Sequence, residues 1–221
     1  MTRTVLIAGA SRGLGLEFVH QYGADGWQVL AGLRDPSAAA FPPGTAALPL
    51  DVRDDASITA LAAALPDLLE LAVVCAGAIG NKNGDYTTPT VDDFDAVMQT
   101  NVRGPIALIE ALAPRMAADG TIAVLSSRMG SIADAESPFA LLYRCSKAAT
   151  NMAVKCASMA FAERGPRVIA LHPGWVRTEM GGPQAPLLPP ESVAGMRAVI
   201  DDADRFASGG FYNYQGQPLP W

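Results

Sequence analysis

Short apolar runs alternate with amphipathic segments along almost the whole chain. Most of these runs are apolar at successive positions rather than at every second one, a pattern typical of strands buried on both faces of a parallel sheet. Strand–helix alternation of this kind predicts a doubly wound α/β sheet with right-handed crossovers. The expected strands are residues 4–8, 27–32, 45–50, 71–76, 121–127, 167–172 and 209–214.

The segments between the runs are helix candidates, and they complete a Rossmann-like fold of about seven strands with helices on both faces. We expect this fold to occupy residues 1–221 as a single domain. The segment 177–190, RTEMGGPQAPLLPP, is rich in glycine and proline and has little periodicity, so we expect a short loop over a cleft. The helix candidates are residues 13–24, 54–64, 91–116, 140–163 and 190–204.

The composition narrows the class of protein. A chain of 221 residues, half of them apolar, suits one domain with a sizeable core. The formal net charge of -6 argues against nucleic-acid binding, which needs a basic surface. No apolar stretch reaches the roughly 18 residues of a membrane span, so we expect no membrane association.

The three cysteines, Cys75, Cys145 and Cys156, lack the spacing of metal ligands. An odd number of cysteines in a domain of this size argues against a framework of disulfides. We therefore expect reduced thiols in the core, no metal site and a cytoplasmic protein.

A glycine-rich turn, AGASRGLG, follows the first expected strand and opens the first expected helix. Gly9, Gly13 and Gly15 let the backbone turn tightly and approach a pyrophosphate, which the free N–H groups of a helix N-terminus attract. The turn therefore indicates a dinucleotide site, although a plain glycine turn is the alternative from this motif alone.

Two arginines bear on the choice of dinucleotide. Arg12 lies inside the glycine turn, and Arg34 stands at the end of the second strand, where NAD-binding proteins usually carry an acid. Two guanidinium groups suit a 2′-phosphate, so we predict NADP(H) as the preferred cofactor, with NAD(H) possible. Asp35 follows directly and weakens this preference, and either arginine could instead be an exposed surface residue.

The sequence YRCSK places Tyr143 and Lys147 four positions apart on an expected helix, so their side chains share one face. A nearby ammonium favours the phenolate, and a phenol with a lowered pKa can exchange a proton with a carbonyl oxygen. Ser127 ends the strand TIAVLSS and is expected at the crevice where ligands bind. Alone, the pair could be incidental neighbours, and the serine could cap the backbone.

Taken together, these motifs resemble the classical short-chain dehydrogenase/reductase family, and within it the C-factor and sniffer-type carbonyl reductase branch. The resemblance runs from residue 4 to the C-terminus. It rests on GASRGLG, LDVRD (50–54), CAG (75–77), TNVRG (100–104), SSRMG, YRCSK and HPGWVRT (172–178).

The resemblance implies roles for four catalytic residues. Tyr143 is the acid/base, Lys147 lowers its pKa and binds the nicotinamide ribose, Ser127 polarises the carbonyl, and Asn101 holds a water that links Lys147 to solvent. It also implies that one NAD(P)-binding domain spans the chain. The implied cofactor-binding residues are Gly9, Ser11, Arg12, Gly13, Leu14, Gly15, Arg34, Asp51, Val52, Ala76, Gly77, Asn101, Tyr143, Lys147, Pro173, Gly174, Val176 and Thr178.

Two departures from the family pattern stand out. Cys75 replaces the asparagine of an Asn-Ala-Gly turn, which removes a side chain that braces the backbone. The interval from Ser127 to Tyr143 is long for the family, and we expect it to form part of the substrate wall.

The function that follows is hydride transfer between a nicotinamide and a small carbonyl or alcohol substrate. A dinucleotide-binding regulatory or signalling protein with little turnover is the alternative, whereas an epimerase or dehydratase would need a larger substrate domain. The apolar character of helices 91–116 and 140–163, with the resemblance, predicts a homodimer or homotetramer through them. Trp221 is expected to pack against a neighbouring subunit, cap the cleft or fray.

Overall fold

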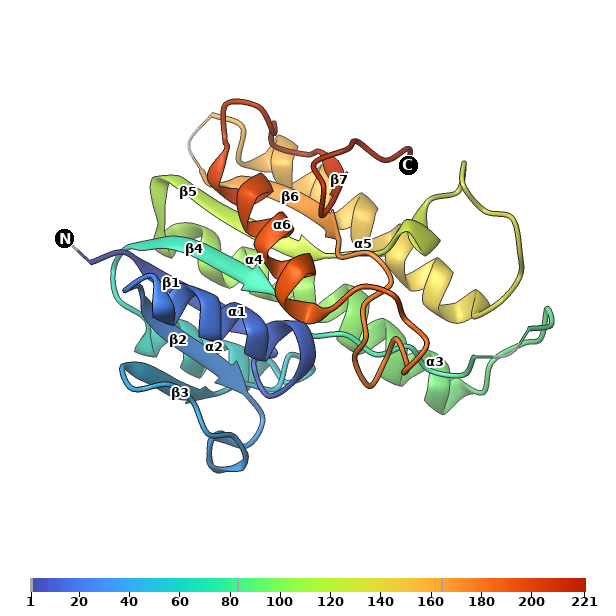
Figure 1. Ribbon diagram of the computed structural model, residues 1–221, viewed down its shortest axis with the longest axis horizontal. Coiled ribbons are helices and arrows are strands. Elements are labelled where there is room, and N and C mark those ends of the chain that lie inside the picture. The colour runs from blue at the N-terminus through green and yellow to red at the C-terminus, as the bar shows by residue number, and fades with distance from the viewer. Residues whose placement is uncertain (1, 83, 164) are drawn as a thin grey trace.

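The computed structural model describes residues 2–82, 84–163 and 165–221. Its centre is a seven-stranded sheet in the order β3-β2-β1-β4-β5-β6-β7, with every neighbouring pair parallel (Figure 1). The prediction of a doubly wound parallel sheet of about seven strands is confirmed. The strands are β1 (Thr4–Ala8), β2 (Gln28–Leu33), β3 (Thr45–Pro49), β4 (Leu69–Val74), β5 (Met116–Leu125), β6 (Arg167–His172) and β7 (Phe211–Asn213).

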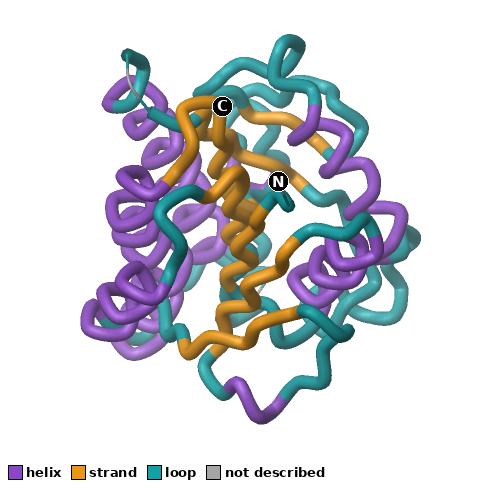
Figure 2. Tube along the Cα trace, turned by 90° about the vertical axis from the view of Figure 1, so that its left-hand side faces the viewer, coloured by secondary structure: helices purple, strands orange, loops and turns teal. Residues whose placement is uncertain are grey.

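Helices cover both faces of this sheet, which Figure 2 shows with helices on either side of the strands. Helices α1 (Gly13–Ala24) and α6 (Pro189–Asp201) pack on one face and contribute to one apolar cluster. The other cluster holds residues from α2 (Asp55–Ala64), α4 (Gly104–Leu112) and α5 (Leu141–Ala160). Helix α3 (Val91–Met98) precedes α4.

Strand β1 shows why the runs are apolar at successive positions. All five of its residues are buried. Val5 and Ile7 belong to the cluster under α1 and α6, whereas Leu6 and Ala8 belong to the cluster under α2, α4 and α5. Because side chains alternate between the two faces of a strand, a sheet covered on both faces needs an apolar residue at each position.

The prediction of one helix over residues 91–116 is wrong. Helix α3 ends at Met98, a π-helical turn spans Gln99–Arg103, and α4 starts at Gly104. Pro105 has no N–H to donate to the carbonyl of Asn101, and the Thr150 hydroxyl donates to that carbonyl instead, at 2.7 Å. The extra residue of the π turn thus leaves Asn101 fully buried against α5.

Other boundaries differ less. Helix α1 matches the expected 13–24, but β5 begins at Met116 rather than at residue 121. Helix α6 begins at Pro189, so the last two residues of the expected loop 177–190 are helical. No helix in the described residues is both long and apolar enough to cross a membrane.

The expectation of three core thiols is wrong for two of them. Cys75 is partly buried, whereas Cys145 and Cys156 are exposed on α5. They lie on the outer side of the helix, away from the face that Val154 packs into the core.

Candidate active site

The candidate active site lies at the carboxyl ends of the parallel strands, where ligands bind in open α/β sheets. The glycine turn follows β1, the turn 75–77 follows β4, the serines follow β5, and the loop 173–188 follows β6. Helix α5 brings Tyr143 and Lys147 to the same edge.

The backbone of the glycine turn packs so closely that residues with a side chain cannot replace Gly9 or Gly15. A Cβ atom on Gly9, whose φ is +94°, would lie 2.6 Å from the backbone nitrogen of Ala76. A Cβ atom on Gly15 would lie 2.1 Å from the Gly9 carbonyl oxygen. The turn therefore leaves bare backbone at the N-terminus of α1, as a bound pyrophosphate requires. Of the other expected turn residues, Ser11 is exposed and Leu14 is half-buried.

Arg12 and Arg34, the expected phosphate ligands, are both exposed. Arg12 precedes the first residue of α1, and its guanidinium pairs with the Glu179 carboxylate at 2.6 Å. Sequence reasoning missed Glu179, because nothing in the pattern brings residues 167 positions apart together. Arg34 lies at the end of β2 and acts electrostatically on Asp51.

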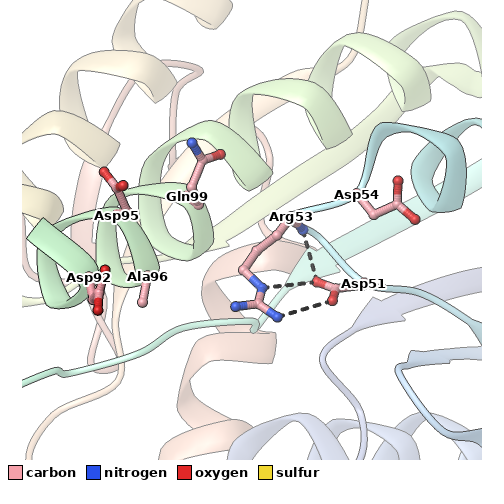
Figure 3. Close-up of a pocket in the computed structure, with 7 residues that line it drawn as sticks. All are labelled: Asp51, Arg53, Asp54, Asp92, Asp95, Ala96 and Gln99. Atoms are coloured by element: carbon pink, nitrogen blue, oxygen red, sulfur yellow. Dashed lines mark hydrogen bonds and ion pairs between the residues drawn. The ribbon is translucent and has the colours of Figure 1, made fainter.

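Asp51 and Val52 follow β3. The hydrogen bond from the Arg53 amide, at 3.0 Å, holds the pKa of the Asp51 carboxyl below its usual value. Val52 is buried, and its carbonyl oxygen would lie 2.8 Å from a Cβ atom on Gly104. Asp51 also borders a hollow of about 470 Å³ beside α3, shown in Figure 3. Its lining residues are Asp51, Arg53, Asp54, Asp92, Asp95, Ala96 and Gln99.

Asn101 links three segments of the site. Its side-chain oxygen accepts from the Ala78 amide at 2.7 Å, and its side-chain nitrogen donates to the Ala78 carbonyl at 2.7 Å and to the Ser146 hydroxyl at 2.9 Å. Ser146 in turn donates to the Tyr143 carbonyl at 2.8 Å. The buried amide therefore fixes the turn after β4 against α5.

Lys147 is buried to 4% exposure, and its ammonium donates to the Leu125 carbonyl at 2.8 Å. Burial disfavours the charged form and lowers the pKa of Lys147 to about 8. The same nitrogen would lie 3.8 Å from a Cβ atom on Gly77, and Ala76 beside it donates to the Ala8 carbonyl. The turn after β4 thus borders the ammonium directly.

Tyr143 is 8% exposed, and the centre of its ring lies 5.7 Å from the Lys147 ammonium nitrogen. Burial raises the pKa of Tyr143 to about 12, while the nearby Ser127 hydroxyl acts in the opposite direction. The role of Lys147 in setting this pKa stays a prediction.

Ser127 begins a short 3-10 turn, Arg128–Gly130. Its hydroxyl oxygen accepts from the Met129 amide at 3.1 Å, and the hydroxyl hydrogen faces the Tyr143 phenol, whose pKa it lowers. Ser126 instead donates to the Asn151 side chain at 2.5 Å, which ties β5 to α5. As expected from strand alternation, the two serines have different partners.

The loop after β6 lies against the glycine turn. The Pro173 carbonyl accepts from the Ser192 hydroxyl at 2.6 Å, and Val176 pairs with Leu187. Gly174 has a φ of +86°, and a Cβ atom there would lie 2.8 Å from Leu187. A Cβ atom on Gly13 would lie 3.5 Å from the Thr178 methyl carbon, which brings the expected carboxamide segment to the cofactor turn.

The sequence comparison with family models decides the family. The model described as short chain dehydrogenase matches residues 3–186. The chain belongs to the short-chain dehydrogenase family. This confirms that it is a member of an oxidoreductase family, as the motifs predicted.

Individual relatives within the short-chain dehydrogenases are also similar. C-signal of Myxococcus xanthus is 44% identical over 131 residues, which cover 58% of this chain and 79% of that protein. The structure of carbonyl reductase Sniffer of D. melanogaster is 28% identical, with a TM-score of 0.90 over all of both chains. NADPH-bound carbonyl reductase from chicken fatty liver is 36% identical, with a TM-score of 0.87 over 100% of this chain and 99% of that one. These similarities confirm the C-factor and sniffer-type branch.

Sequence reasoning missed the side chains that support the site of this short-chain dehydrogenase. Ser146, Thr150 and Asn151 are buried polar residues on α5, and each makes hydrogen bonds to the active-site segments. They lie one to four positions from Lys147, on the same buried side of the helix. Because buried polar side chains need hydrogen-bond partners, this spacing could have indicated that they contact the site.

Trp175 and Met180 lie in the loop 173–188 after β6. They are 57% and 37% exposed, so neither belongs to the core. The Trp175 indole donates to the Gly181 carbonyl, and Lys82 donates to the Met180 carbonyl, both at 2.8 Å. The loop is thereby joined to itself and to the segment after β4.

Proposed function

We propose that the chain is an NADP(H)-dependent oxidoreductase that interconverts a carbonyl compound and its alcohol, with Tyr143 as acid/base. The observation that carries this proposal is the burial of Tyr143 and Lys147 together, next to a glycine turn that leaves bare backbone at a helix N-terminus. Burying a phenol and an ammonium costs free energy of folding. Ionisable groups that are buried together with shifted pKa values are typical of functional sites. We further propose that residues 1–221 form one cofactor-binding domain.

Backbone N–H groups of the glycine turn would hold the pyrophosphate, and Arg12 and Arg34 would bind the 2′-phosphate. Pro173, Gly174, Val176 and Thr178 would face the nicotinamide end. The reductase from chicken fatty liver contains NADPH, which supports this preference. When bound, the cofactor supplies the hydride.

The chain itself would supply protons and orientation. With a pKa of about 12, the Tyr143 phenol is protonated at neutral pH and is able to donate a proton to a carbonyl oxygen as negative charge develops there. The Ser127 hydroxyl, whose oxygen already accepts from Met129, would donate to the same oxygen. Two donors converging on one oxygen stabilise the developing alkoxide.

Lys147 would keep positive charge beside Tyr143 and bind the ribose of the cofactor. Its hydrogen bond to Leu125 fixes the ammonium at the end of β5. Asn101 would hold the turn after β4 and a water that connects Lys147 to solvent. Both N–H groups of the Asn101 side chain and one lone pair of its oxygen already make hydrogen bonds to Ala78 and Ser146. The proposed water would therefore donate to a free lone pair on an oxygen of Asn101 or of the turn beside it.

The test is consumption of NADPH by the purified chain with a panel of aldehydes, ketones and quinones. We expect turnover with members of the panel and weaker turnover with NADH. Tight NADPH binding without oxidation by any compound of the panel, or in the reverse direction with the matching alcohols, would contradict the proposal.

A signalling function is the second candidate, and the name of one relative, C-signal, favours it. The two functions differ in their need for Tyr143. A cellular phenotype restored equally by the wild type and by Tyr143→Phe would support signalling, whereas restoration by the wild type alone would support catalysis.

We also propose a homodimer or homotetramer formed through α4 and α5, in the cytoplasm. Apolar side chains are exposed on these helices, including Ile106, Met152 and Met159. The free cysteines suit a reducing compartment. Light scattering on the wild type and on Met152→Glu would test the interface, since the charge should shift the assembly toward monomers.

A further inference from the structure

The C-terminal segment folds back along the last strand and reaches residues 131–133, which follow Ser127 in the chain. The Leu219 amide donates to the Phe211 carbonyl at 2.8 Å, and Pro218 forms an antiparallel bridge with Tyr212. In Figure 1 the C-terminus extends from β7 toward the segment between β5 and α5. Of the three alternatives for Trp221, the frayed tail is therefore not what the structure has.

Trp221 is anchored to the core through its ring. The indole stacks on Phe211 with a centroid separation of 5.5 Å and an interplanar angle of 20°. Phe211 is only 2% exposed and packs in the cluster under α2, α4 and α5. An offset stack of this kind adds to the free energy gained by burying the ring.

One backbone oxygen of Trp221 accepts three hydrogen bonds from one segment. The amides of Ile132 and Ala133 donate at 3.2 and 3.1 Å, and the Ser131 hydroxyl lies at 3.4 Å. Ser131 is 1% exposed and also accepts from the Asp134 amide. In the part of the chain that the structure describes, this segment pairs with no strand, so the Trp221 oxygen ties it to the last strand of the sheet.

Very little chain separates this anchor from Ser127. The Gly130 amide donates to the Ser127 carbonyl at 2.8 Å, and the Ser131 amide donates to the Arg128 carbonyl at 3.0 Å. A Cβ atom on Gly130 would lie 2.7 Å from the carbonyl carbon of Lys147, so the turn already rests on α5. A displacement of residues 131–133 would consequently also displace the turn that Ser127 begins.

We propose that Trp221 is a positioning residue for the reaction: by anchoring residues 131–133, it holds the Ser127 hydroxyl in the active site. This inference rests on the proposed function, because Ser127 matters only if a carbonyl oxygen is to be polarised. Trp221 does not need to touch the substrate for this role. The exposed Ile132 belongs to the anchored segment itself.

The experiment is a double-mutant cycle on kcat/KM for carbonyl reduction with Trp221→Ala and Ser127→Ala. Because misplacing a catalytic group by a fraction of an ångström is costly, Trp221→Ala should lower kcat/KM about tenfold in the wild-type background. In the Ser127→Ala background it should have an effect of less than about twofold, since the group it positions is gone. The dissociation constant for NADPH should stay within about twofold, and Trp221→Phe, which keeps the stack, should restore activity.

Hydrogen exchange supplies a readout that needs no turnover. The Ile132 and Ala133 amides should be protected in the wild type and exchange faster in Trp221→Ala. Equal losses in both backgrounds, no loss at all, or unchanged exchange would overturn the role of Trp221. Absence of carbonyl reduction by the wild type would instead overturn the proposed function, so the two failures are distinguishable.

Discussion

The Lys147 ammonium nitrogen lies 5.7 Å from the centre of the Tyr143 ring but donates its hydrogen bond to the Leu125 carbonyl. Burial shifts the two groups in opposite directions, with pKa values of about 8 for Lys147 and about 12 for Tyr143. Both shifts favour the uncharged forms, as desolvation requires. The phenol is therefore protonated at neutral pH, the form that carbonyl reduction needs.

Burial of Lys147 should make stability depend on pH. Its pKa is 10.5 when unperturbed and about 8 in the folded chain. Between these values the unfolded chain holds the proton that the folded chain has lost, so the free energy of unfolding rises with pH. Relative to Lys147→Met, the wild type should gain about 2 kcal/mol between pH 8 and 10 in urea unfolding. Parallel pH curves for the two proteins would show that the ammonium is not desolvated.

His172, at the end of β6, should produce the analogous effect in acid. Burial, with the Arg128 cation nearby, lowers the pKa of His172 from 6.5 to about 4, and its Nδ1 atom is buried with no hydrogen-bond partner among the described residues. As pH falls through this window the unfolded chain gains a proton first, so stability is lost. His172→Gln should remove about 2 kcal/mol of the loss between pH 6.5 and 4.5.

His20→Gln is the matched control for that measurement, because His20 is exposed on α1. It should keep the acid sensitivity of the wild type. If His172→Gln kept the wild-type sensitivity as well, the buried imidazole would not be its cause.

Two glycines of α1 offer a direct comparison of steric demand. A Cβ atom on Gly15 would meet the Gly9 carbonyl oxygen at 2.1 Å, whereas one on Gly23 meets nothing within 4 Å. Gly15→Ala should cost about 1–3 kcal/mol of stability and weaken dinucleotide binding. Gly23→Ala should stabilise the chain by up to about 1 kcal/mol. Thermal unfolding and NADPH titration measure both effects, and equal behaviour of the two variants would contradict the close approach in the turn.

The pairing of Arg12 with Glu179 should influence the choice of cofactor. Both side chains are more than 70% exposed, so the ion pair itself adds little stability. Arg12→Ala should raise the dissociation constant for NADPH about tenfold and leave that for NADH nearly unchanged. Glu179→Gln frees Arg12 and should leave NADPH binding equal or tighter. Equal weakening of both dinucleotides by Arg12→Ala would show that this arginine does not bind the 2′-phosphate.

Features that depend on the local sequence pattern could be predicted well. The sheet follows from the apolar runs, and the start of α1 follows from the glycine-rich turn that precedes it. The break between α3 and α4 was missed, although Gly104, Pro105 and the largely polar π turn Gln99–Arg103 signalled it.

Features that depend on tertiary contacts could not be predicted in this way. The pKa of Tyr143 depends on how deeply α5 is buried, which spacing from Lys147 does not reveal. Neither the Arg12–Glu179 pair nor the contacts of Trp221 have a local signal, since their partners are distant in sequence. The catalytic and cofactor roles of the site residues stay predictions.

The proton-donor role of Tyr143 is tested most directly by the turnover of Tyr143→Phe at saturating NADPH, with a carbonyl substrate that the wild type reduces. Removing the hydroxyl should lower kcat about a thousandfold, because the remaining Ser127 hydroxyl would polarise the carbonyl without giving up its own proton. NADPH affinity should change by less than about twofold, since the ring itself is retained. A kcat within about tenfold of the wild-type value would contradict the assignment of Tyr143 as the acid.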